Sequence, residues 1–416
     1  MNFNLNNDLS FSLILIPTFL ISGPLIPELL TLLSISIFLY LVIKNKNFKY
    51  FKNKYTYFFI LFFVIINLRS LFVSDLILSI KSTLFYFRFY LLSLSIWYVL
   101  DTNYKFGKKF LNLLIISMII LIIDAFIQYK FGTNILGMAK THHSRVSSFF
   151  GDELVLGSYL VRLLPLTIGL YVFIHYKKFS VINAIVLFFI ILMMYCGISV
   201  SGDRTAFYLS LLFLPFLFIL KNIKYLKNKI YPLALLFIIF FSLFIFNNEN
   251  LKKRIFNSTF SSMVYFDSKK NDKINFVLFS HNHQTHIKTA YNIFLDNKFF
   301  GIGVKQYRNF CKDKKYFVNK WSCVTHPHNI YAQFLAELGI FGFAFLFAFF
   351  IYIIIRIFNN LFIVKKTPLV LLNFLVLSGL FINLFPFAPA GNFFNNWLSM
   401  IYYYPLGFYL YSRKEK

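Results

Sequence analysis

The sequence predicts an all-α polytopic membrane protein with about twelve transmembrane helices, and three observations predict this class. Apolar side chains make up 58% of the 416 residues, and 59 residues are phenylalanine, which is more apolar surface than one soluble core could bury. Runs of roughly 20 mainly apolar residues, the length of a spanning helix, recur along the whole chain. The first run leads straight into a second one, so we expect no cleavable signal peptide.

The twelve expected spans are these apolar runs. They cover roughly 9–22, 25–43, 55–72, 82–100, 109–128, 153–175, 180–198, 205–220, 231–246, 329–355, 368–385 and 395–411. The first is short, and we expect it to tilt or to pair tightly with the second through Gly23-Pro24. Pro165 and Pro215 are expected to kink their helices, which is tolerated in lipid when neighbours satisfy the freed carbonyl.

Lysines and arginines in the short connections predict the orientation, because these residues are retained on the cytoplasmic side. They fall at alternate connections and in the C-terminal tail. Both termini are therefore expected in the cytoplasm. The net charge of +27 is then mainly a signal of topology, so no nucleic acid is expected as a partner. Long loops escape this rule, so the basic segment 247–327 can lie outside.

The outer face is then assembled from the connections near 73–81, 129–152, 199–204, 247–327 and 386–394. Seven of the eight histidines lie in these segments or at their ends, and only His175 falls on the inner side. Histidine can give or take a proton near neutral pH, so this distribution favours an outward-facing site. We expect one integrated membrane domain, with spans one to nine in 1–246, an outer loop containing short helices in 247–327, and spans ten to twelve in 328–416.

Two motifs place an arginine on this outer face. Arg145 stands in HHSRVSSFFGDELVLGSYL, ahead of a helix expected near Asp152, and Arg204 stands in SGDRTAF between two apolar spans. An arginine at the end of a membrane span is energetically unfavourable unless it pairs with an acidic group or binds a ligand. Arg204 therefore either pairs with Asp203 or lies at the interface, or it binds phosphate, since a guanidinium donates two parallel hydrogen bonds to a phosphate.

A third motif, HPHN, joins the long loop to an apolar helix. Residues 284–297 are typical of an amphipathic helix, and Phe300–Gly303 of a tight turn. Pro327 prevents the residue before it from continuing a helix, so His328 or Asn329 is the expected N-cap beside the positive end of the helix dipole. That dipole is expected to lower the pKa of His328, and a neutral imidazole is what a general base requires.

His326 and His328 differ in what they can do. They flank a proline, so we expect their side chains to point in different directions. His328 is favoured as the base because it is next to Asn329 and the start of the helix. Further along this helix, Glu337 is expected to pair with an intramembrane arginine such as Arg88 or Arg162.

The order of these motifs resembles the O-antigen ligase and O-antigen polymerase superfamily of bacterial inner-membrane glycan transferases. The residues that carry the resemblance are R-x-x-S-F-F-G-D-E-x-x-L-G at Arg145–Gly157, S-G-D-R at Ser201–Arg204, G-x-G at Gly301–Gly303, and H-P-H-N at His326–Asn329 followed by E-L-G-I-F-G at Glu337–Gly342. The ligase-like region spans about 140–350, and the topology is similar over nearly the whole chain.

This resemblance implies a family C glycosyltransferase fold, no metal and no other cofactor. The donor would be a glycan on undecaprenyl diphosphate. The acceptor would be a sugar hydroxyl of lipid A core in a ligase, the favoured alternative, or another lipid-linked repeat in a polymerase. The implied catalytic histidine is His328, with His326 as second candidate, and Arg145 and Arg204 would clamp the diphosphate during inverting transfer.

The reaction chemistry agrees with these roles. A diphosphate is already a good leaving group, so the protein mainly has to position the reactants and stabilise negative charge, which fixed cations can do. The remaining candidates for a substrate cleft are Arg88, Arg162, Arg308 and Asn329.

Three other functions compete with glycan transfer. The histidines at 281, 283 and 286 have a spacing that could bind zinc, but their setting is basic, and the nearest acids are Asp267 and Asp272. A transporter or flippase would need polar groups at mid-membrane in paired halves, whereas here they crowd the outer face. A non-enzymatic anchor would not need Arg, His and Gly at these positions.

The cysteines give a clue to the compartment. Cys196 falls within a span and is expected to be a buried small residue. Cys311 and Cys323 both fall in the outer loop. In an oxidising periplasm they can pair, which would stabilise the fold by roughly 3 kcal/mol.

Overall fold

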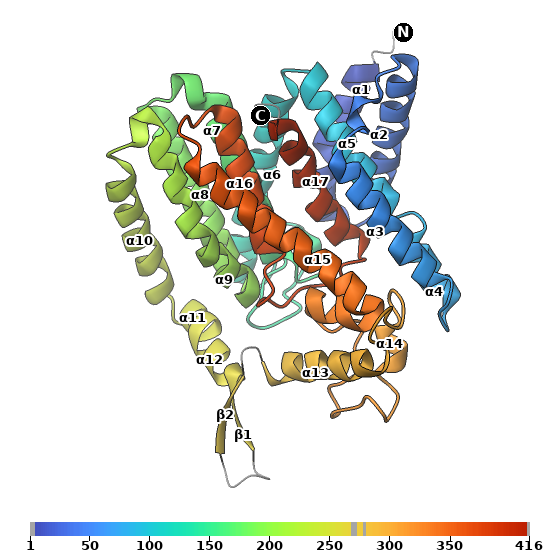
Figure 1. Ribbon diagram of the computed structural model, residues 1–416. Coiled ribbons are helices and arrows are strands. Elements are labelled where there is room, and N and C mark those ends of the chain that lie inside the picture. Colours follow the sequence, from blue (N-terminus) through green and yellow to red (C-terminus); the bar gives the residue numbers. More distant parts are fainter. Residues whose placement is uncertain (1–4, 268–272, 278–279, 414–416) are drawn as a thin grey trace.

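The computed structural model describes residues 5–267, 273–277 and 280–413, and it is almost entirely helical (Figure 1). The long helices of the bundle are α1 (Leu5–Phe19), α2 (Leu25–Lys44), α3 (Lys54–Ser70), α4 (Leu76–Thr83), α5 (Phe87–Thr102), α6 (Phe106–Phe131), α7 (Leu156–His175), α8 (Val181–Val200), α9 (Arg204–Phe213), α10 (Ile230–Phe246), α15 (Ile330–Phe362), α16 (Pro368–Asn383) and α17 (Asn396–Ser412). A helix lies at each of the twelve apolar runs that the sequence singled out.

The class of polytopic membrane protein is confirmed, but the number of spans is not. Among the described residues, eight helical segments are long and apolar enough to cross a membrane. A ninth is added if α10 and the segment Glu249–Met263, which are bent by 93° at their junction, form one span. Pro215 lies where α9 changes into a 3₁₀ helix, Leu214–Asn222, whereas α7 continues through Pro165.

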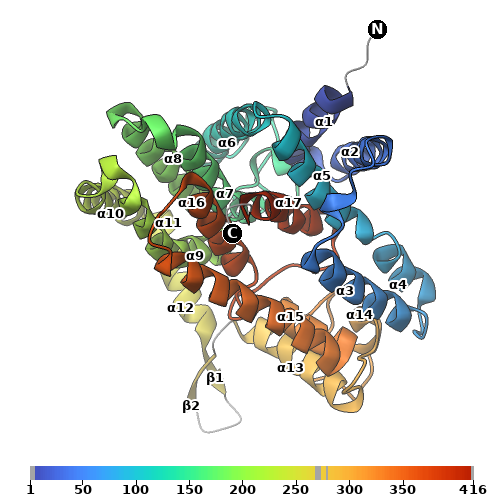
Figure 2. The same ribbon diagram turned by 45° about the horizontal axis from the view of Figure 1, so that its top comes forward.

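The middle of the bundle is formed by α7, α16 and α17, which the other helices surround (Figure 2). In the segment Leu156–Lys178, 83% of the most apolar stretch of 18 residues is buried inside the protein. Small residues allow the close packing, as is common between membrane helices. A Cβ added to Gly379 on α16 would lie 3.0 Å from Pro165 Cβ on α7. The centre is therefore a tight helix interface that supports the segments at its ends.

The segment between α10 and α15 lies at one end of the bundle, opposite the end where α1 begins and α17 ends (Figure 1). It contains α11 (Glu249–Lys252), a π-helix (Lys253–Asn257), α12 (Ser258–Met263), the antiparallel strands β1 (Val264–Asp267) and β2 (Lys273–Phe276), α13 (His281–Asp296) and α14 (Tyr307–Phe310). The predicted amphipathic helix is confirmed as α13. The β-hairpin was not predicted, so the expectation of an all-α fold is corrected at this point.

A second small core holds α13 against the first turns of α15. It includes Ala290 and Ile293 of α13 and Ala332 and Ala336 of α15. The Tyr307 hydroxyl donates to the backbone carbonyl of His286 (3.2 Å) and to that of Ser322 (2.8 Å).

The two loop cysteines are joined in this core. Cys311 and Cys323 form a disulfide with their Cα atoms 5.0 Å apart. The pairing that the sequence left open is thus present in the structure, and it closes the segment that follows α14.

A break in α15 receives the predicted turn at 300–303. Gly339 has φ 66°, and a Cβ there would overlap the Phe299 carbonyl, so only glycine suits this position. Beside the break, the Ile302 amide donates to Ala336 O (2.9 Å), and the Gly303 amide donates to Glu337 O (2.7 Å). The Ile340 amide donates to the carbonyl of residue 298 at 2.7 Å. The turn therefore docks onto the helix backbone.

This docking also explains why the predicted pairing of Glu337 is wrong. Its carboxylate accepts from Gln333 Nε2 (2.9 Å) and from the Tyr307 amide (3.5 Å). Arg88 pairs with Glu28 at 2.5 Å, and Arg162 donates to Asn383 Oδ1 at 3.1 Å. Loop backbone amides reach Glu337 in place of an arginine.

Candidate functional site

A cavity of about 960 Å³ is lined by residues of the bundle helices and by His283 of α13. It collects predicted site residues that are far apart in sequence, namely Arg145, Arg162, Arg204, Arg308, His326 and His328. It also contains Arg254 and Lys305, which the sequence did not single out, and His283, which the sequence singled out only as part of a zinc-binding spacing. Arg88 and Asn329, which were candidates for a substrate cleft, do not line it.

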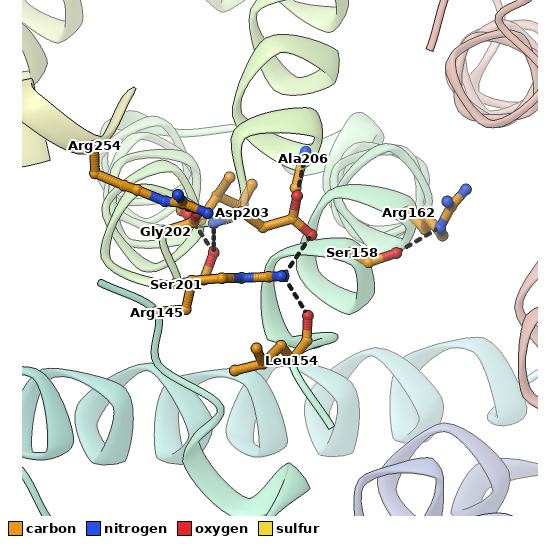
Figure 3. A network of polar contacts seen from close by, with 10 residues as sticks. Arg145, Leu154, Ser158, Arg162, Ser201, Gly202, Asp203, Ala206 and Arg254 are labelled. Atoms are coloured by element: carbon orange, nitrogen blue, oxygen red, sulfur yellow. Dashed lines mark hydrogen bonds and ion pairs between the residues drawn. The ribbon is translucent and has the colours of Figure 1, made fainter. Parts of the chain in front are cut away.

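Arg145 and Arg204 lie in the cavity wall with different partners. Arg145 Nη2 donates to Leu154 O at 2.6 Å and lies 3.8 Å from Asp203 Oδ2 (Figure 3). Arg204 Nη1 donates to Ser258 O at 2.5 Å and to Ser262 Oγ at 3.1 Å. The ion pair considered for Arg204 and Asp203 is therefore made by Arg145, because the carboxylate turns toward the 145 segment.

Backbone contacts bring the two arginine motifs together. The Val146 amide donates to Ser201 O at 3.1 Å. Gly202 has φ 67°, and a Cβ there would overlap the Ser144 carbonyl, so the approach requires glycine. On the other side, a Cβ on Gly157 would lie 2.5 Å from Ser201 Oγ. The 201–203 turn is thus enclosed between the 144–146 segment and α7.

Arg254 reaches the same turn from the π-helix. Its Nε donates to Gly202 O at 3.0 Å (Figure 3). Sequence reasoning missed this residue, because nothing in the basic stretch KKRIF separates it from its neighbours. Arg145 Nε is buried and has no hydrogen-bond partner among the described residues. The guanidinium groups of Arg145 and Arg254 therefore both contact the 201–203 turn, and Arg145 retains an unused buried donor.

The charge of the cavity is strongly positive. Six basic side chains line it, those of Arg145, Arg162, Arg204, Arg254, Lys305 and Arg308, against two acidic ones, those of Glu153 and Asp203. A concave site lined by one sign of charge concentrates ligands of the opposite sign. The cavity is therefore suited to an anionic group, and guanidinium groups match a phosphate or diphosphate in geometry.

His328 is held at the cavity by its backbone. The N-cap of α15 is Asn329, whose Oδ1 accepts from the amides of Tyr331 and Ala332, both at 3.0 Å. His328 itself has φ 54°, and its carbonyl accepts from the Ala390 amide at 2.8 Å. The left-handed region is costly for a non-glycine residue. The surrounding loops therefore fix the backbone of His328 at the cavity.

Burial lowers the pKa of His328 to about 3, and the nearby imidazoles of His326, His283 and His286 add to this effect. The predicted direction is correct. The cause differs, because desolvation and neighbouring imidazoles, and not the helix dipole, account for it. His328 is therefore neutral at physiological pH, as a general base must be.

His326 lies beside His328, with ring centroids 4.2 Å apart. The expectation that the two side chains point in different directions is wrong, since the turn around Pro327 brings them to the same side. His326 Nδ1 lies 2.9 Å from Thr325 Oγ1, and burial lowers the pKa of His326 to about 4.

The histidine-rich start of α13 also reaches this place. The ring centroid of His328 lies 5.4 Å from that of His283 and 5.2 Å from that of His286. The described residues contain no group of three or more His, Cys, Asp or Glu side chains arranged to hold a metal ion. Of the acids named with the zinc alternative, Asp272 and the side chain of Asp267 lie outside the described residues.

Comparison with known proteins agrees with this geometry. Residues 187–347 match the sequence model of the family described as O-antigen ligase. This range includes Arg204, Arg254 and the four clustered histidines, whereas Arg145 precedes it. A search of the curated proteins finds no match. The resemblance seen in the sequence is thus confirmed for this part of the chain, which is similar to the O-antigen ligase-related superfamily.

Proposed function

We propose that the protein transfers a glycan from undecaprenyl diphosphate to a sugar hydroxyl, most specifically O-antigen to lipid A core, with inversion and without a metal ion. The observation that carries this proposal is the meeting of Arg145, Arg204 and Arg254 with His328 in one cavity. The family match supports a glycan-transferring enzyme.

The chemistry follows from these positions. The acceptor hydroxyl gives its proton to the neutral imidazole of His328, and its oxygen attacks the anomeric carbon from the face opposite the leaving group. The bond from this carbon to the diphosphate oxygen breaks, and its electron pair stays on the diphosphate. Arg145, Arg204 and Arg254 neutralise the charge that develops there. Such fixed donors are most effective in a site that is partly removed from water.

The proposed location is the bacterial inner membrane, with the cavity facing the periplasm and both termini in the cytoplasm. The lysines and arginines of the short connections support this orientation. α1 begins and α17 ends at the end of the bundle away from α13 (Figure 1).

The direct test of the reaction is transfer by the purified full-length protein in lipid nanodiscs. The substrates are a defined glycan on undecaprenyl diphosphate and lipid A core. We expect glycosylated lipid A core and free undecaprenyl diphosphate in equal amounts. Release of the lipid diphosphate without a glycosylated product would contradict transfer.

An O-antigen or exopolysaccharide polymerase is the alternative within the same chemistry, with another lipid-linked repeat as acceptor. Lipopolysaccharide from a deletion strain separates the two activities. Bare core indicates a lost ligase, and a single repeat on core indicates a lost polymerase.

A further inference from the structure

The first turns of α13 bring two more imidazoles to His328. We propose that His283 and His286 take up the proton that His328 removes from the acceptor, so that the three side chains handle this proton as one group. This proposal rests on the proposed transferase function. It concerns a segment that the catalytic scheme above does not use.

The rings are close enough to exchange a proton through one bridging water molecule. Their centroids form a triangle with separations of 5.2, 5.4 and 6.0 Å. His283 lines the cavity beside His328, whereas His286 lies behind them and is only 5% exposed. The triangle therefore leads from the cavity wall into the interface between α13 and α15.

The hydrogen bonds of the two α13 histidines leave ring nitrogens open toward the group. His283 Nδ1 lies 2.8 Å from Ser280 Oγ, at the start of the helix, so its Nε2 remains for another partner. His286 Nδ1 is buried and has no hydrogen-bond partner among the described residues. A buried ring nitrogen without a partner is costly unless it is used. The backbone of His286 is fixed by the Tyr307 hydroxyl.

A proton acceptor beyond His328 is needed because each transfer releases one proton. The O–H bond of the acceptor breaks as the glycosidic bond forms, and the diphosphate leaves with the electron pair of the broken bond. The proton then remains on His328 while donor and acceptor fill the cavity. Passing it to His283 or His286 returns His328 to its neutral form, and the proton later leaves to water.

The groups around the three rings favour transfer of the proton away from His328. Apart from one another, the charged and titratable groups that face the three rings are Arg204 of α9, which acts on His283, and His326 of the preceding loop, which acts on His328. Each is a cation or becomes one on protonation, so an imidazolium is disfavoured at His328 and His283. At His286, a hydrogen bond to the Trp321 backbone favours the protonated form instead. Rings that interact in this way take up a proton as one group.

The test uses purified full-length protein in nanodiscs with His283→Gln, His286→Gln and, as a control on the same helix, His281→Gln. We expect kcat to fall roughly 100-fold in the first two variants, as for a lost proton-transfer group. The KM for the lipid diphosphate donor should stay unchanged, and added imidazole should restore part of the rate. His281→Gln should keep the wild-type rate.

Rescue by imidazole separates proton transfer from a structural role. Loss of rate without rescue, together with a lowered melting temperature, would overturn the proposal, and so would wild-type kcat in both variants. If His286→Gln does not fold, His286→Asn is measured in its place.

Two further results would also count against it. A requirement for added Zn²⁺, with loss of activity in a chelator, would make these histidines metal ligands. Wild-type protein without transfer activity would contradict the proposed function itself, and the proposal with it.

Discussion

Arg145 Nη2 lies 3.8 Å from Asp203 Oδ2, and the same carboxylate accepts at 3.2 Å from the Ala206 amide, so that it caps α9. One side chain thus orients an arginine of the cavity and begins the helix whose first residue is Arg204. The two arginine motifs are coupled through Asp203.

Replacing Asp203 separates these two roles. Asp203→Ala removes the cap and the ion pair, so we expect a loss of about 1 kcal/mol in stability and a lower transfer rate. Asp203→Asn retains a capping oxygen and should melt near the wild type while still losing rate. Ser180 caps α8 and lies outside the cavity. Ser180→Ala should therefore lower the melting temperature and leave the transfer rate unchanged. Equal rates in all three variants would refute the coupling.

Gly157 allows the close approach of α7 to the 201–203 turn. In Gly157→Ala the new Cβ would lie 2.5 Å from Ser201 Oγ and 2.7 Å from Asp203 Cβ. Such overpacking typically costs about 1–3 kcal/mol, so the melting temperature and the transfer rate should both fall. Gly107→Ala is the matched control, because its nearest neighbour would be Leu100 Cδ2 at 3.9 Å. A Gly157→Ala protein as stable and active as this control would contradict the packing argument.

The disulfide between Cys311 and Cys323 should stabilise the small core that carries α13. Removing both cysteines is expected to lower the local free energy of opening by roughly 3 kcal/mol, seen as faster hydrogen exchange in α13 and α14. Cys196→Ala should leave this exchange unchanged. Thiol titration of the unreduced, denatured protein should find one free thiol of three. Finding all three free would exclude the bridge.

The histidines of the cluster should become protonated at a lower pH than an exposed histidine does. The pKa is lowered to about 3 for His328 and to about 4 for His283, so these side chains stay neutral well below pH 6.5. The acidic limb of kcat/KM is therefore expected nearer pH 4 than pH 6.5.

Stability should respond to pH in the same range. The unfolded chain binds these protons near pH 6.5, so the free energy of unfolding should fall as the pH drops from about 6.5 toward 4. Melting temperatures at pH 7 and pH 5 test this direction, and the value at pH 5 should be lower. In the rate profile, an acidic limb of kcat/KM at pH 6.5 would show that His328 is solvated.

Regular elements could be predicted from the sequence because their periodicity is local. Residues 25–43 became α2, Leu25–Lys44, and residues 284–297 became α13, His281–Asp296. The β-hairpin was missed, since its short strands Val264–Asp267 and Lys273–Phe276 lie in a polar segment without a strong alternating pattern.

The contacts between segments could not be predicted in the same way. Sequence motifs placed Arg145, Arg204 and His328 on one face, but not the approach of residues 144–146 to Gly202. That approach depends on backbone conformation in loops. It also decides that Arg145, and not Arg204, pairs with Asp203, and a spacing along the chain contains no such information.

The most direct test of the proposed site is the transfer rate of Arg204→Ala and His328→Ala in purified full-length protein. Loss of one fixed donor to the diphosphate typically costs on the order of 100- to 1000-fold in rate, and a lost general base costs a similar factor. We therefore expect both variants to be slower by at least about 100-fold. Arg413→Ala and His175→Ala, which lie outside the cavity, should retain the wild-type rate. Rates within about threefold of wild type in both site variants, far from the loss expected for a donor or a base, would contradict the account.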